Sequence, residues 1–150
     1  MDDEAGQAYP ATVNSLLDNA LGPNGYYGTF GTNMHNDNPA PHPGAEAIIA
    51  SAQARDVPVI SYKQLLTWVD GRNASTIRGL AWNAGTFTFV TTVGAGAQGL
   101  QTMLPVQGPS GTLQSLSCAG SSQPFSVQTI KGIQYAMFTT VNGTCTANYN

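Results

Sequence analysis

The sequence has 150 residues, of which only 9% are charged, and its formal net charge is −3. Average soluble proteins contain about 25% charged residues. The five lysines and arginines are too few to cover one face with cations, which argues against binding to nucleic acid or to an anionic membrane surface. No run of 18 or more apolar residues is present, so we expect no membrane span.

The polar but weakly charged composition is typical of an exported protein. The first ten residues, MDDEAGQAYP, are acidic and lack the apolar core of a signal peptide, so we expect any signal to lie upstream of them. In an oxidising compartment, Cys118 and Cys145 have two alternative states. They form a disulfide that ties the last strand to its sheet, or they remain buried free thiols. We therefore expect a secreted or cell-envelope protein.

Residues 1–74 alternate between helical and strand-like patterns. Apolar residues at the helical period predict three helices, over Ala11–Leu21, Gly44–Arg55 and Tyr62–Asp70. β-forming residues predict two strands, Gly25–Asn33 and Val57–Ser61. Such alternation is typical of β/α units with parallel strands. Two parallel strands form a small layer, so we expect the free edge of the second strand to be covered by the β-sandwich, by a second copy in a homo-oligomer or by sequence that is missing here.

From residue 75 to residue 150 the helical period is absent. Short runs of β-branched or alternating residues recur every 8–12 residues between Gly, Ser and Pro, which is the pattern of a sandwich. The expected strands are Arg78–Asn83, Thr86–Val93, Leu100–Leu104, Leu113–Cys118, Phe125–Ile130, Ile133–Thr139 and Thr144–Tyr149. The predicted fold class is therefore mixed α+β. A partial β/α layer over residues 1–74 is followed by an antiparallel β-sandwich over residues 75–150.

The polar cluster that follows the first predicted strand is the strongest candidate for chemistry. His35 and Asp37 stand there, just before a Pro-rich loop and a helix, where α/β proteins bind their ligands. A histidine held by a neighbouring carboxylate is suited to general acid catalysis near neutral pH. A metal site built from His35, Asp37 and His42 is an alternative. We expect the acidic residues 2–4 to form a solvated tail.

Several short motifs of the first 73 residues resemble the C-terminal end of the polysaccharide deacetylase (NodB-like) family. The elements that carry the resemblance are Met34-His35 as the family's apolar-His strand end, the helix Ala45–Ala54, the strand Val57–Ser61, the Leu65-Leu66 pair, and the segment Trp68–Asn73 that leads into a β domain. The chain is similar to the tail of large secreted bacterial proteins that contain such a module.

The resemblance implies a distorted β/α barrel that removes acetyl groups from sugars with a divalent metal such as zinc. It also implies that His35 acts as the general acid that protonates the leaving sugar oxygen. The family's metal ligands come from earlier strands and are absent from this sequence, so we expect no cofactor in this chain. We expect a C-terminal fragment of a carbohydrate-active protein that is inactive alone, since an activated water needs about three protein ligands on the metal.

Binding of a polysaccharide or cell-surface glycan without catalysis is the alternative function. Flat aromatic side chains offer surfaces on which a sugar ring can stack. We expect Tyr27, Met34 and Trp82 to contact the substrate. Trp82 lies in an alternating strand, so its side chain belongs either to the core or to an exposed sugar platform.

Overall fold

The chain forms two compact units, Met1–Ile60 and Ser61–Asn150. The structure is a computed structural model that describes residues 1–23, 25, 28–37 and 39–150. The sequence predicts the boundary between residues 74 and 75, where helices give way to strands. In the structure the boundary falls after Ile60, so the third helix belongs to the same unit as the strands. The chain combines helices with antiparallel sheets, as the mixed α+β prediction states.

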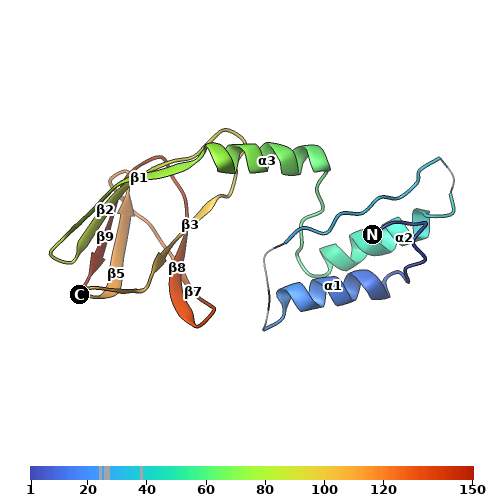
Figure 1. Cartoon of the computed structure of the whole chain (residues 1–150), viewed down its shortest axis with the longest axis horizontal. Helices are drawn as coiled ribbons and strands as arrows, with labels where there is room; N and C mark the ends of the chain where they lie inside the picture. Colours follow the sequence, from blue (N-terminus) through green and yellow to red (C-terminus); the bar gives the residue numbers. More distant parts are fainter. Residues whose placement is uncertain (24, 26–27, 38) are drawn as a thin grey trace. The chain divides into compact units, whose positions relative to one another are not determined.

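The first unit contains two helices that pack against each other. Helix α1 spans Ala11–Leu21, as predicted, and α2 spans His42–Gln53. Figure 1 shows the two helices side by side. Their shared core consists of Val13, Leu17, Ile48 and Ala52. A bidentate ion pair also joins Arg55, just after α2, to Asp18 of α1, with Nε 2.7 Å from Oδ1. The two helices are therefore joined by a small apolar cluster and a surface ion pair.

The two strands expected in this unit do not form as predicted. Within Gly25–Asn33, of which Tyr26 and Tyr27 lie outside the described residues, only Asn33 takes part in a β-bridge. The segment Val57–Ser61 has no strand structure, and Val59 and Ile60 are 56% and 50% exposed. β-forming residues make a strand only where a neighbouring strand accepts their hydrogen bonds. Since Val57–Ile60 is no strand, the free edge that we expected the sandwich, a second copy or missing sequence to cover is not formed.

A short parallel pairing nevertheless joins the N-terminal residues to the segment before His35. Asp2 and Asn33 form a parallel bridge. The Asn33 amide donates to the Met1 carbonyl over 2.9 Å, and the Asp3 amide donates to the Asn33 carbonyl over 3.3 Å. Each of these extended segments is followed by a loop and a helix. Among the described residues, the first unit therefore has one parallel bridge and not the two parallel strands that the sequence predicts, so the predicted partial β/α layer is not formed.

The second unit begins with helix α3, Tyr62–Ala74. Ser61 caps it, and Gln64 completes a capping box. The sequence predicts that Gly71 ends this helix, which is wrong. Gly71 continues it for another turn and is buried against the backbone of Ala95 and Ala97, where a β-carbon has no room.

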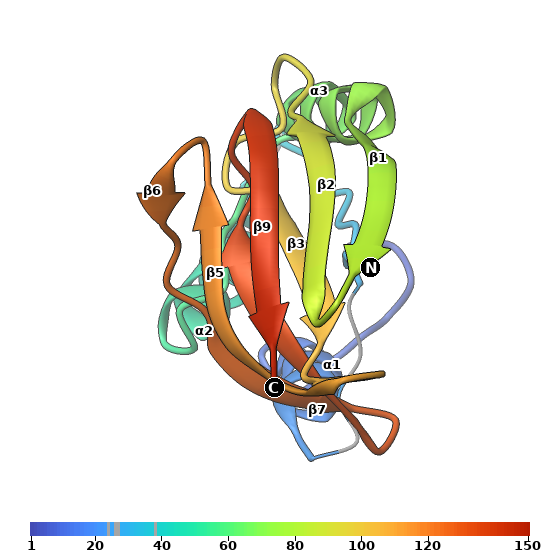
Figure 2. The same cartoon turned by 90° about the vertical axis from the view of Figure 1, so that its left-hand side faces the viewer.

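The strands of the second unit form two antiparallel sheets. All seven predicted strands are confirmed within a few residues, and two short strands, β4 and β6, are added. Their bounds are β1 Thr76–Asn83, β2 Thr86–Thr92, β3 Gln101–Pro105, β4 Gln107–Gly108, β5 Gly111–Cys118, β6 Ser121–Ser122, β7 Ser126–Ile130, β8 Ile133–Thr139 and β9 Gly143–Tyr149. The larger sheet has the order β1-β2-β9-β5-β4, with β6 beside β5, and the smaller has the order β3-β8-β7. Figure 2 shows the larger sheet face-on.

Side chains from both sheets meet in one core, so the two sheets pack against each other. Phe89, Leu116 and Tyr149 come from the larger sheet, and Leu104 and Phe138 come from the smaller one. Cys118 and Cys145 face each other on β5 and β9 and form a buried disulfide. The two cysteines thus form the disulfide, and the alternative of two buried free thiols is not observed. Among the described residues, no helix is long and apolar enough to span a membrane.

Candidate functional site

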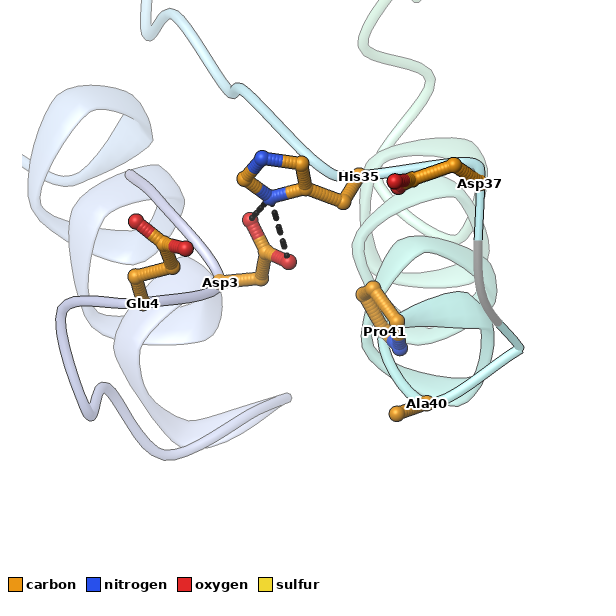
Figure 3. A pocket seen from close by; sticks show the side chains of 6 residues that line it. All are labelled: Asp3, Glu4, His35, Asp37, Ala40 and Pro41. Carbon is orange, nitrogen blue, oxygen red and sulfur yellow. Dashed lines mark hydrogen bonds and ion pairs between the residues drawn. The ribbon is translucent and has the colours of Figure 1, made fainter.

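An open pocket of about 430 Å³ lies in the first unit, at the end of the parallel bridge. It is lined by Asp3, Glu4, His35, Asp37, Ala40 and Pro41. Figure 3 shows that Asp3 and Glu4 come from the N-terminal segment and that His35 and Asp37 come from the segment before α2. The pocket lies just past the carboxyl ends of two parallel segments, which is where α/β proteins place their ligand sites.

The side chain of His35 is hydrogen-bonded to Asp3. Its Nδ1 lies 3.1 Å from Oδ1 and 3.1 Å from Oδ2 of the carboxylate, although the two residues are 32 positions apart. The His35 side chain is 42% exposed, and that of Asp3 is 13% exposed. The second ring nitrogen, Nε2, lies on the side of the ring away from Asp3 (Figure 3). One nitrogen is thus bonded to Asp3, while the other points away from that carboxylate (Figure 3).

The carboxylates of the pocket raise the pKa of His35 above its ordinary value of 6.5. The hydrogen bond to Asp3 is the largest cause, and the negative charges of Asp3 and Glu4 follow. Desolvation of the ring acts in the opposite direction, and the charge of Asp37 adds the smallest favourable contribution. The carboxylates thus stabilise the imidazolium form of His35, which is the form that can donate a proton.

The N-terminal segment is ordered by its own hydrogen bonds rather than frayed. The Asp2 carboxylate accepts from the Glu4 amide over 2.9 Å and from the Asn33 side chain over 3.4 Å. These two bonds lower the pKa of Asp2. The terminal ammonium donates to the Gly31 carbonyl over 2.7 Å. The expectation of a solvated acidic tail over residues 2–4 is wrong, because Asp2 fixes the segment and places Asp3 beside His35.

The two residues predicted to be catalytic line the same pocket, but they are not partners in a hydrogen bond. The ring of His35 is bonded to Asp3, whereas Asp37 acts on it only through its charge. Glu4 likewise contributes charge. The carboxylate that orients the histidine is thus Asp3, while Asp37 remains one of the groups that give the pocket its negative charge.

The described residues do not fit a metal centre. Among them, no three His, Cys, Asp or Glu side chains form a group that could hold an ion. His42 is the first residue of α2 and does not line the pocket. A metal site needs about three protein ligands, so the alternative site of His35, Asp37 and His42 has no support in this arrangement.

The residues expected to bind substrate lie in different places. Met34 is partly buried and packs against the core of the first unit, next to Gly44. Tyr27 lies outside the described residues. Trp82 lies on β1 of the second unit and is 39% exposed. Met34 therefore supports the segment before His35, while Trp82 is open to solvent.

Sequence reasoning missed Asp3 and Glu4 as members of the site. The order of elements is the signal that would have found them. The acidic residues 2–4 precede a loop and helix α1, just as His35-Asn36-Asp37 precedes a loop and helix α2. The preceding extended segment pairs through one bridge only, which is too short to give a strand pattern. Comparison with models of protein families, with curated proteins and with solved structures gave no match to this chain.

Proposed function

We propose that the first unit supplies a proton-donating histidine to the active site of a secreted carbohydrate-active protein of the polysaccharide deacetylase-like type, of which this chain is the C-terminal part. The single observation that carries the proposal is the hydrogen-bonded pair of His35 and Asp3 in an acidic pocket. The position of the pocket past the ends of two parallel segments supports it. The paired cysteines, Cys118 and Cys145, are consistent with an extracellular location.

The pair is suited to general acid catalysis. Asp3 holds Nδ1 of His35, so the proton to be transferred is the one on Nε2. In ester or amide hydrolysis of an acetylated sugar, that proton goes to the departing oxygen or nitrogen of the sugar as its bond to the acetyl carbon breaks. The raised pKa of His35 favours the protonated ring that this step requires. The roles are therefore proton donor for His35 and positioning residue for Asp3.

The proposal assigns water activation to residues outside this chain. The described residues contain no group that could hold a metal ion, and proton donation alone does not hydrolyse an acyl group. In an intact parent protein, a divalent metal such as zinc would be held by other strands. We therefore expect this chain to be inactive alone and its partner to be an acetylated polysaccharide or cell-surface glycan.

The test is acetate release from an acetylated polysaccharide such as acetylxylan. The chain alone should release none, and a longer protein that contains it should release acetate. In the longer protein, His35→Ala should lower kcat by about 10²–10⁴-fold, as expected for loss of a general acid. His42→Ala is the matched control and should leave turnover unchanged, since His42 does not line the pocket. Unchanged turnover in His35→Ala would remove the residue from the mechanism.

A further inference from the structure

Trp82 lies on the rim of the second unit's core, where the sandwich is open. It is opposite Phe87 in the register of β1 and β2, so its side chain is on the face that carries Phe87 and Phe89. Phe89 is 1% exposed, whereas Trp82 is 39% exposed. β1 is the first strand in the order of the larger sheet. The inner face of β1 is therefore only partly covered by side chains of the core.

The indole of Trp82 is nevertheless held firmly. Its ring centroid lies 5.2 Å from that of Tyr149 and 6.0 Å from that of Phe87. The Tyr149 hydroxyl donates to the Pro105 carbonyl over 3.0 Å. A β-carbon added to Gly108 would lie 3.2 Å from Cη2 of Trp82 and 2.7 Å from Cδ1 of Tyr149. Gly108 thus lets the backbone lie directly against both rings, so Trp82 is a fixed surface.

The residues that flank this surface are polar and uncharged. Gln107 and Ser110 stand on either side of the Gly108-Pro109 pair, and both are exposed. Amides and hydroxyls are both donors and acceptors, as are the hydroxyl groups of a sugar. Arg78, the cation of β1, is opposite Val90 and so lies on the other face of the sheet. These neighbours favour a neutral ligand over an ionic one.

We propose that Trp82 is the stacking platform for one ring of a neutral pyranose glycan, fixed by Tyr149 and Gly108. This binding site belongs to the second unit and is independent of the proton transfer proposed for His35. A tryptophan buries about 250 Å² when fully covered, so its open part offers roughly 100 Å², which suits one sugar ring. Because a single stacking contact on an open surface gives little binding energy, the dissociation constant should be about 1 mM.

A strand from a second copy is the competing occupant of this region, because β1 is an edge strand. Ile77, near the start of β1, and Leu80 are also exposed, and exposed apolar edges favour strand pairing. Such pairing would depend on Ile77, whereas a sugar ring on Trp82, five positions further along the strand, would not. Ile77→Asp therefore separates the two occupants.

The experiment is a titration of the ¹⁵N-labelled full chain with cellohexaose, xylohexaose and chitohexaose as neutral probes, and with hexagalacturonate as the anionic control. The chain has two tryptophans, so the spectrum contains two indole N–H signals. Trp68 donates its indole N–H to the Gln98 carbonyl over 3.0 Å and serves as the internal reference. We expect at least one neutral probe to shift the Trp82 signal in a saturable manner while the Trp68 signal stays in place.

Variants decide whether the platform is responsible. Trp82→Ala should weaken binding at least tenfold, and Gly108→Ala should weaken it while keeping the indole present. Trp68→Phe and Ile77→Asp should bind as the wild type does. The proposal is overturned if no neutral probe moves the Trp82 signal, if hexagalacturonate binds better than all of them, or if binding is abolished by Ile77→Asp. A folded spectrum of Gly108→Ala with unchanged binding would also overturn it.

Discussion

Nδ1 of His35 lies 3.1 Å from both carboxylate oxygens of Asp3, and the two residues are 32 positions apart in the chain. The contact depends on the parallel bridge between Asp2 and Asn33, which places the next residues of both segments side by side. An exposed carboxylate and an exposed imidazole would gain little from each other as isolated surface charges. Here the backbone pairing holds Asp3 and His35 close together. The nearby carboxylates of Glu4 and Asp37 also raise the pKa of the histidine.

The first prediction concerns pH and the stability of the first unit. The folded pKa of His35 is raised, so the stabilisation by the pair is complete below the ordinary pKa of 6.5 while Asp3 is ionised. It is lost as the pH rises through the folded pKa. Asp3→Asn should therefore speed amide hydrogen exchange in α1 more at about pH 6 than at about pH 9. An equal effect of this substitution at both pH values would contradict the account.

The disulfide between β5 and β9 should contribute strongly to the second unit. Cys118 and Cys145 are 27 residues apart, and a loop of that length corresponds to about 3–4 kcal/mol in the chain-entropy account. The double variant Cys118→Ala/Cys145→Ala should lower the free energy of unfolding by that amount in denaturant titrations. A loss below about 1 kcal/mol would show that the sandwich does not depend on the bond.

Gly71→Ala should destabilise the second unit, although the position lies in a helix. Alanine normally favours a helix over glycine by about 1 kcal/mol, but here its β-carbon would collide with the backbone of Ala95 and Ala97. We expect a net loss of about 1–3 kcal/mol in thermal or chemical unfolding. Gly44→Ala in α2 is the matched control, because its β-carbon would meet only side-chain atoms of Met34 and Tyr9. A stabilised Gly71→Ala protein would disprove the packing of α3 on this loop.

The turn between β1 and β2 offers a stabilising substitution. Ala84 has φ of 45° and Gly85 has φ of 86°, which is the backbone of a type I′ turn, where asparagine is preferred at the first position. Ala84→Asn should raise the free energy of unfolding by about 0.5–1 kcal/mol. Ala81→Asn, in the strand before the turn, should lower it, since asparagine is a poor strand residue. If both substitutions destabilise equally, the turn type is wrong.

Local signals account for what could be predicted from the sequence. The strands of the second unit are separated by turns with clear residue preferences, such as Ala84-Gly85 and Lys131-Gly132, and their side chains alternate between core and surface. Helix α1 shows a regular apolar period, and Ser61 with Gln64 marks the start of α3. In each case the residues that decide the structure are close together in the chain.

The parts that could not be predicted depend on distant residues. Val57–Ile60 is rich in β-formers, yet it remains irregular because no neighbouring strand among the described residues pairs with it. Asp3 is brought to His35 by one parallel bridge, which has no local period. The sequence therefore placed His35 and Asp37 in one candidate site but could not supply the carboxylate that holds the ring.

The most direct test of the central claim is the pH titration of the His35 ring by NMR, followed through its Cε1 proton. In the wild type the midpoint should lie above 6.5, and in Asp3→Asn it should fall because the hydrogen-bonded carboxylate is lost. Asp37→Asn should lower it less, since Asp37 makes the smallest favourable contribution. The same midpoint in the wild type and in Asp3→Asn would contradict the pairing on which the proposed proton donor depends.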